Sequence, residues 1–408
     1  MLKAKSVAKV AITAGLAFGL IAAGASTAQA EPNPAGFRTY AAVGSDTIQD
    51  LYNAFGNGYG TNAAVAGTIA SYDAFGTSTT IKTSATGPSY TRPAGSGDGR
   101  KALSAAYDSA NHVWKTVTLS EADVKIARSS GKPSAANTVT ATSTDNKLTS
   151  IPLARDAVGV ATKGIASSVT NLSTEQLTAI YGGGASGTAS ATGNYRQSAT
   201  RFSVGDVVRT TSNTSADPVI VTGVTANGAA VSASVQLNPK LPQDSSGTRS
   251  FFLGAVGASA QATWVDSGSN TFQENNATVL STTGDVIPFS AAQYISQKNG
   301  VVADSGVSTI NLPSINGAKA ANLTPAGVAS AGALYGDLTV PATGPFNREV
   351  YSVVPTALLA SDASLNTLVT TTLPRAAAPI QAFGFQVLQY NNAGVAGTTG
   401  YIYSKFEH

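Results

Sequence analysis

Three turns rich in glycine, serine and threonine each lead directly into a segment with helical spacing. These turns are residues 44–47, 95–99 and 245–248 of the 408-residue chain. The unpaired N–H groups and partial positive charge of a helix start attract anions, and glycine lets an oxyanion approach the backbone closely. One such turn is a common helix start. Three in one chain favour a fold in which helix ends converge on a small oxyanion.

Apolar strands alternate with helices along most of the chain, which indicates an α/β class. Ser45 or Asp46 is expected to cap the first helix, and other helices are expected after Gly99, Ser173, Ser246 and Ser290. Strands are expected near residues 37–43, 124–127, 151–161 and 348–355. This alternation is typical of mostly parallel sheets, in which ligands bind beyond the carboxyl ends of the strands. The three turns are expected at those positions.

Residues 184–240 have a different character, because strand-like alternation appears there without any helical pattern. We interpret this stretch as a small all-β insertion. The expected organisation is a signal peptide at residues 1–30, a first lobe at 31–155, and a second lobe at 156–347 that contains the insertion. Residues 348–408 are expected to return to the first lobe.

The first thirty residues have the pattern of a signal peptide, with three lysines, a mostly apolar stretch and the small-x-small ending Ala28-Gln29-Ala30. A retained N-terminal anchor is the alternative, although the apolar run is short for a membrane span. Removing the three lysines from 25 basic residues leaves 22, which equals the 22 acidic residues. This balance does not favour a nucleic-acid partner. No later segment predicts a membrane span, so we expect an extracellular or cell-envelope protein.

The chain contains no cysteine and only two histidines, His112 and His408. This excludes disulfides, thiolate metal sites, a cysteine nucleophile and the lipidated cysteine that tethers many exported binding proteins. Two histidines so far apart also argue against a zinc site or a Ser-His-Asp triad. We therefore expect no catalytic residue, metal or cofactor, and a protein that is not an enzyme.

The order of the motifs is a G-x-x-T turn before a helix, a G-S-x-x-G turn, a strand ending in A-x-S-x, and S-G-T opening a helix. This order resembles the phosphate-binding proteins of phosphate ABC transporters, and most closely their exported actinobacterial relatives. The resemblance covers most of the chain outside the β insertion. It implies a type 2 periplasmic-binding-protein fold, with two α/β lobes joined by crossing strands around an oxyanion.

The resemblance also implies ligand-binding residues in each turn. From the first lobe they are Thr47, the backbone of Ile48, and Ser96, and from the second lobe they are Ser246, Gly247 and Thr248.

One departure from the family pattern concerns ligand selection. The family has a carboxylate after its A-x-S strand end, where this chain has Ser130. That carboxylate accepts the proton of hydrogen phosphate and so rejects sulfate, whereas a serine both donates and accepts. Ser130 is therefore a candidate ligand residue with a weaker filter, and Asp46 or Asp98 is a candidate replacement acceptor.

A second departure concerns the positive charge of the site, because Pro242 stands where the family has an arginine. Arg128 or Arg249 is then the candidate for a bidentate clamp on the anion. A structural ion pair is the alternative role for Arg128, and a solvated side chain is the alternative for Arg249.

The sequence thus predicts an exported, monomeric solute-binding protein that captures a tetrahedral oxyanion, with phosphate as the first candidate, for an ABC permease. Two other functions stay open. One is a secreted envelope or matrix protein that keeps the fold without transport, as the β insertion and the substituted site residues suggest. The other is a secreted phosphatase or serine hydrolase that uses a hydroxyl group from one of the turns.

Overall fold

The computed structural model describes residues 37–59, 68–108, 111–131, 148–165, 169–182, 187–190, 195–196, 199–209, 218–258, 261–267, 272–392 and 401–402. The expected signal peptide and His408 lie outside these residues. Within the described part of the chain, no helix has the length and apolar character needed to cross a bilayer.

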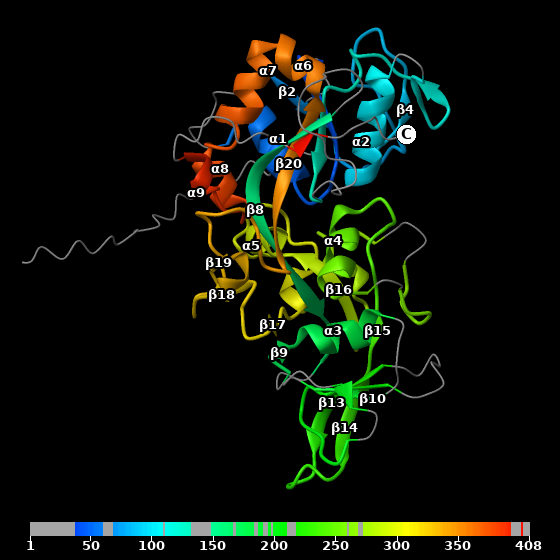
Figure 1. Cartoon of the computed structure of the whole chain (residues 1–408), viewed down its shortest axis with the longest axis vertical. Helices are drawn as coiled ribbons and strands as arrows, with labels where there is room; N and C mark the ends of the chain where they lie inside the picture. The colour runs from blue at the N-terminus through cyan, green and yellow to red at the C-terminus, as the bar shows by residue number, and fades with distance from the viewer. Residues whose placement is uncertain are drawn as a thin grey trace, which may run out of the picture.

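Two lobes lie one above the other, and the long strands β8 (Leu148–Thr162) and β20 (Asn347–Pro355) run between them (Figure 1). Lobe 1 contains β1 (Tyr40–Gly44), α1 (Gln49–Asn57), β2 (Ile69–Ser71), β3 (Thr80–Ile81), β4 (Tyr90–Thr91), α2 (Ser96–Tyr107), β5 (Val113–Trp114), β6 (Val117–Thr118), β7 (Ile126–Ser129), α6 (Thr356–Ser361), α7 (Ala363–Thr367), η6 (Leu368–Thr372), α8 (Ala377–Ala382), α9 (Gln389–Asn392) and β21 (Tyr401–Ile402). Lobe 2 contains β9 (Asn171–Leu172), α3 (Thr174–Tyr181), β10 (Gly187–Ala189), β11 (Tyr195–Arg196), β12 (Val207–Arg209), β13 (Val219–Val224), β14 (Val231–Gln236), β15 (Asn238–Pro239), α4 (Gly247–Ala255), η3 (Ala277–Val279), β16 (Asp285–Ser290), α5 (Ala291–Lys298), η4 (Val307–Thr309), β17 (Ser314–Ile315), β18 (Ala321–Leu323), β19 (Ala329–Ala331) and η5 (Ala333–Tyr335).

One eight-stranded sheet continues through both lobes in the order β15-β16-β8-β20-β7-β1-β2, and β21 also pairs with β8. Strands β7, β1 and β2 are parallel in lobe 1, and β15 and β16 are parallel in lobe 2. Strands β8 and β20 are antiparallel to each other. The chain crosses to lobe 2 through β8 and returns through β20, so these two strands must run in opposite directions. The α/β fold is therefore built on a mixed sheet, whose parallel strands lie at its two ends.

Two buried ion pairs hold the crossing strands in register. Arg155 lies opposite Glu349 and bonds it at 3.1 Å, while Asp156 lies opposite Arg348 and bonds it at 2.9 Å. Opposite charges facing each other across two strands favour one register over its neighbours, because a shifted register would leave buried charges unpaired. These pairs fix the connection between the two lobes.

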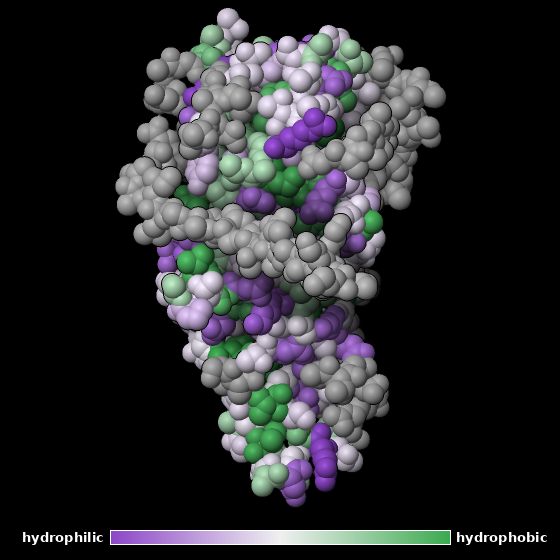
Figure 2. Space-filling view, turned by 90° about the vertical axis from the view of Figure 1, so that its left-hand side faces the viewer, coloured by the Kyte–Doolittle hydropathy of each residue, from purple (hydrophilic) through white to green (hydrophobic). Residues whose placement is uncertain are grey.

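The insertion forms a separate antiparallel sheet in the order β11-β10-β12-β13-β14, at the end of lobe 2 farthest from lobe 1 (Figure 1). The alternating pattern in the sequence predicted both β13 and β14. Between them Gly228 has a left-handed φ of 70°, which a turn can adopt cheaply only with glycine. Figure 2 shows polar and apolar side chains mixed over both lobes, with some apolar groups gathered near this narrow end.

Each lobe has its own apolar core on both faces of the sheet. In lobe 1, one cluster packs α1 and the C-terminal helices on one face, and α2 covers the other. In lobe 2, α3 and α4 share a cluster with the insertion, and α5 also packs against β16. These cores place the first turns of α1, α2 and α4 at the junction of the lobes.

Candidate functional site

The three turns identified in the sequence meet at the junction between the lobes. Thr47 Oγ1, just before α1, lies 3.4 Å from Thr248 Oγ1 in the first turn of α4. A Cβ added to Gly247 would lie only 2.6 Å from Ser96 Oγ and 2.7 Å from Ser130 Oγ. Only glycine therefore allows α4 to approach the start of α2 this closely. Hydroxyl groups from both lobes surround one small region as a result.

The geometry before α1 differs from the expected one, because neither Ser45 nor Asp46 caps the helix. Ile48 is the residue before α1, and no side chain accepts a hydrogen bond from the helix start. The backbone carbonyl of Asp46 accepts the N–H of Gln49 at 3.2 Å instead. The expected cap at Ser45 or Asp46 was therefore wrong, because the helix begins later in the chain and the Asp46 carboxyl is buried near Glu274.

A buried carboxylate, Glu274, lies at the centre of the hydroxyl groups. Thr47 Oγ1 and Thr248 Oγ1 donate to Glu274 Oε1 at 2.9 and 3.0 Å, and Ser246 Oγ donates to Oε2 at 2.9 Å. All four side chains are almost completely buried. We call Thr47, Ser246, Thr248 and Glu274 the hydroxyl cluster. Its three donors come from both lobes, so the carboxylate joins the lobes.

Ser246 has two roles in this arrangement. Its Oγ accepts the N–H of Arg249 at 3.0 Å, which caps α4 as the sequence predicted, and the same hydroxyl donates its proton to Glu274. Gln293 of α5 supports the opposite side, because its Nε2 donates to the carbonyl of Thr47 at 2.7 Å. Both contacts hold the donors in place.

Asp46 adds a second buried carboxyl group beside Glu274. Burial, and then the charge of Glu274, raise the pKa of Asp46 well above its usual range. Two carboxylates in contact inside a protein cannot both stay ionised at low cost. Burial and the nearby charge therefore both favour the neutral form of Asp46, and the three hydroxyl donors all bond to Glu274.

Ser96 and Ser130 form a second hydroxyl pair next to Gly247. Their Oγ atoms are 3.2 Å apart, and the N–H of Ser130 donates to Ser96 Oγ at 2.9 Å. Because the Oγ atoms of both residues lie close to Gly247, this pair adjoins the hydroxyl cluster through α4. Ile48, one residue after Thr47, is buried in the apolar core of lobe 1.

Arg128 is fully buried, and all five of its N–H groups donate to the protein. The acceptors are Ser45 O, Ala42 O, Ser71 Oγ, Gly44 O and Tyr72 O, at 2.6–3.2 Å. Burial lowers the pKa of Arg128 to about 10, so the group stays charged at neutral pH. In this arrangement Arg128 fixes the end of β1 and has no N–H group left for a ligand.

Arg249 is directed toward its own lobe. Its Nη1 lies 2.7 Å from Asp244 Oδ1 and donates to Pro242 O, and its Nη2 donates to Gln261 Oε1 at 2.9 Å. Of the two candidate acceptors, Asp46 lies beside Glu274, whereas Asp98 lies 3.9 Å from Lys115. The structure thus brings the hydroxyl residues together, and it engages both arginines elsewhere.

The groups of this site are hydrogen-bond donors and acceptors. Serine and threonine hydroxyls donate to acceptor oxygens, and the buried side chain of Glu274 provides an acceptor. Across the described ranges, no group of three or more His, Cys, Asp or Glu residues is placed to hold a metal ion. From the sequence, Glu274 is interpreted as a structural residue, because no spacing or motif around it points to the turns.

No family model and no curated protein sequence matches the chain. Solved structures that match it include an ABC-type phosphate transport receptor from Vibrio cholerae, with 16% identity and a TM-score of 0.43 over 85% of this chain and 99% of that one. A putative phosphate ABC transporter substrate-binding protein with bound phosphate from Clostridium perfringens has 12% identity and a TM-score of 0.45 over 85% and 98%. A phosphate-binding protein from Stenotrophomonas maltophilia has 14% identity and a TM-score of 0.44 over 86% and 91%.

The names of these structures describe phosphate-binding and phosphate-transport proteins, which the motif order also resembles. With TM-scores below 0.5, they decide nothing about the ligand of this chain. The two-lobed mixed α/β fold and the hydroxyl cluster at the lobe junction rest on the contacts described above.

Proposed function

We propose that the protein is an exported solute-binding protein that captures a tetrahedral oxyanion between its lobes, with phosphate as the first candidate. The observation that carries this proposal is the hydroxyl cluster. Its donors, one from lobe 1 and two from lobe 2, already bind an anion, because Glu274 presents two negatively charged oxygens to them. A phosphate group presents the same kind of oxygen to the same donors.

The charge of the cluster restricts which anion can enter. An arriving anion meets the buried charge of Glu274, while Arg128 and Arg249 are engaged with protein acceptors. An anion that carries its own proton converts this repulsion into a hydrogen bond by donating to the carboxylate. Hydrogen phosphate and dihydrogen phosphate have such a proton, and sulfate does not. Glu274, with Asp46 beside it, thereby takes the place of the acceptor missing at Ser130.

Binding by donors from both lobes favours the closed arrangement of a hinged protein. Delivery to an ABC permease by a monomer is the role that fits such capture, and the order of the sequence motifs supports this part of the proposal. Export is supported by the signal-peptide pattern at residues 1–30.

The test is a thermal-shift and calorimetric titration with phosphate and sulfate. A ligand at 100 times its dissociation constant stabilises the folded state by about 2.7 kcal/mol, so phosphate should raise the melting temperature clearly. Thr248→Val removes one donor and should weaken binding by about 0.5–1.5 kcal/mol, the net contribution of one hydrogen bond, because the native hydroxyl already bonds to Glu274 without a ligand. Thr278→Val makes the same change at an exposed position in lobe 2 and should leave binding unchanged.

A folded protein that responds to none of phosphate, sulfate, arsenate or molybdate would contradict the proposal and leave the envelope role. Turnover of a chromogenic phosphate ester that is lost in Ser246→Ala would instead identify a hydrolase.

A further inference from the structure

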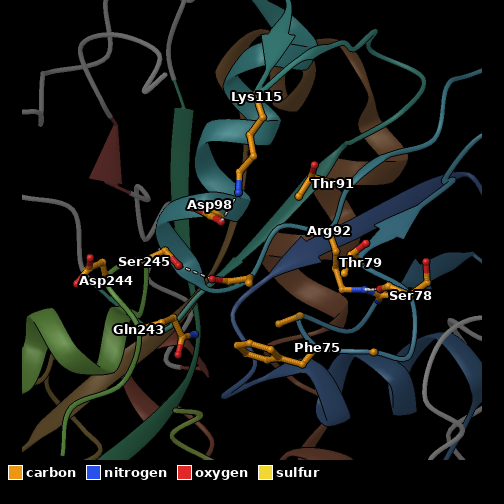
Figure 3. A pocket seen from close by; sticks show the side chains of 13 residues that line it. Phe75, Ser78, Thr79, Thr91, Arg92, Asp98, Lys115, Gln243, Asp244 and Ser245 are labelled. Carbon is orange, nitrogen blue, oxygen red and sulfur yellow. Dashed lines mark hydrogen bonds and ion pairs between the residues drawn. The ribbon is translucent and has the colours of Figure 1, made fainter. Parts of the chain in front are cut away.

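A cavity of about 470 Å³ lies between the lobes beside the hydroxyl cluster. Its walls include Phe75, Asp98 and Lys115 from lobe 1, and Gln243 and Ser245 from lobe 2 (Figure 3). Ser245 also closes the contact between the lobes, because its carbonyl accepts the N–H of Gly97 at 2.9 Å and its Oγ donates to Ala94 O. No residue of the hydroxyl cluster lines this space. The lining of this cavity is therefore distinct from the hydroxyl cluster, and its volume is within the range of small-molecule sites.

The amide of Gln243 marks this cavity as a binding site. The residue is only 2% exposed, and neither its Oε1 nor its Nε2 has a hydrogen-bond partner among the described residues. Buried amides nearly always have such partners, so an unpaired one that lines a cavity indicates a partner from outside the protein. An amide offers one acceptor and two donors side by side. Neighbouring hydroxyl groups, which each donate and accept, match that pair.

The charged residues that line the cavity are balanced, with two basic and two acidic side chains, and each has a partner within the protein. Asp98 lies 3.9 Å from Lys115, and Asp244 lies 2.7 Å from Arg249. Arg92 donates from Nε to Ser78 O at 3.0 Å and from Nη1 to Asp73 O at 2.7 Å. The cavity walls therefore do not favour a ligand with a net charge.

What the walls still offer is the Gln243 amide, the hydroxyl groups of Thr79 and Thr91, and the half-buried ring of Phe75 (Figure 3). An aromatic face beside polar groups suits a ring that is apolar on one side and hydroxylated at its edge. We propose that this cavity binds a neutral polyhydroxylated molecule of the size of a monosaccharide. The Gln243 amide would bond adjacent hydroxyls, and Phe75 would pack against the C–H face. The proposal does not rest on oxyanion capture, since the two sites share no side chain.

The test is calorimetric titration of the whole protein with D-glucose, D-galactose, D-ribose and N-acetyl-D-glucosamine, each up to about 10 mM, which covers millimolar dissociation constants. At least one sugar should bind. Its affinity should change little between about 0.1 M and about 1 M sodium chloride, because a neutral ligand gains nothing from charges that salt screens.

Gln243→Leu should weaken that binding at least about tenfold and leave the phosphate response unchanged. Gln236→Leu makes the same change in the β insertion and should have no effect on either ligand. Phe75→Ala provides a second variant, with a similar loss of sugar binding, should Gln243→Leu fail to fold. Absence of binding by all four sugars, or undiminished binding in folded Gln243→Leu and Phe75→Ala, would overturn the proposal. The proposal would also be overturned if none of the sugars bound and L-alanine, which carries charged groups, bound with an affinity that falls as the salt concentration rises.

Discussion

Replacing Glu274 with glutamine tests whether the buried carboxylate selects the oxyanion. The substitution removes one negative charge and nearly preserves the shape of the side chain. Thr47, Ser246 and Thr248 now donate to Glu274 at 2.9–3.0 Å, so a ligand that shares these donors must come close to the carboxylate. The charge of residue 274 therefore acts directly on any bound anion.

The size of the effect follows from Coulomb's law. Two unit charges 4 Å apart interact by about 4 kcal/mol at an effective dielectric constant of 20. Removing this repulsion should strengthen sulfate binding by up to about three powers of ten. Phosphate gains the same relief but loses the hydrogen bond from its proton to a charged acceptor, which contributes about 1.5–3 kcal/mol. The preference for phosphate over sulfate should therefore fall by about 10- to 100-fold.

The assay is calorimetric titration of both anions into the native protein and Glu274→Gln at neutral pH. Glu121→Gln removes a charge at an exposed position of lobe 1 and should retain the native preference. If Glu274→Gln folds and still prefers phosphate as strongly as the native protein does, Glu274 does not contact the ligand and the reasoning fails. Loss of all anion binding in a folded Glu274→Gln protein would refute it equally, because the cluster keeps its three donors.

Two further predictions concern stability. Asp156→Asn should destabilise the fold by about 3–5 kcal/mol, because it leaves Arg348 buried beside a neutral group, and urea unfolding measures this. Burial, followed by the charge of Asp73, raises the pKa of Asp50 to about 6, so its contribution is full below pH 4 and is lost as the pH rises to about 6. Asp50→Asn should therefore remove about 2 kcal/mol of the fall in the free energy of unfolding between pH 4 and 6, a value reduced because the side chain is partly accessible to water. A variant with the same pH profile of stability as the native protein would contradict this prediction.

Local signals explain how much of the fold could be predicted from the sequence. The alternation at residues 219–224 predicted β13 within its observed bounds, and the Ser173 pattern predicted the capping box that begins α3. The turn before α4 was also predictable, since a serine cap followed by glycine is a local feature. Each of these signals depends on residues within one turn or one strand.

The missing parts of the site depend on contacts between distant segments. Glu274 accepts a hydrogen bond from Thr47, 227 positions away in the sequence, and no local pattern around either residue predicts this contact. Arg128 bonds to carbonyls in and just after β1 and to the carbonyl just after β2, so its role follows from the sheet. The expected cap of α1 failed for the same reason, because the Asp46 carboxyl is buried near Glu274, which is distant in the sequence.

The buried carboxylate of Glu274 reduces the affinity that the hydroxyl cluster can have for an anion. In a cleft with unbonded donors, a ligand gains every hydrogen bond that it makes. Here the donors of the hydroxyl cluster are already satisfied by Glu274, so a ligand gains only the difference between its own bonds and those it displaces. The bonds from both lobes to Glu274 also stabilise the closed arrangement of the lobes without a ligand. Only molecules in which the cluster is accessible can bind the anion, so the apparent affinity falls in proportion to their fraction. Capture should therefore be weaker than the number of donors suggests, and release correspondingly easier, because Glu274 returns to the donors as the anion leaves.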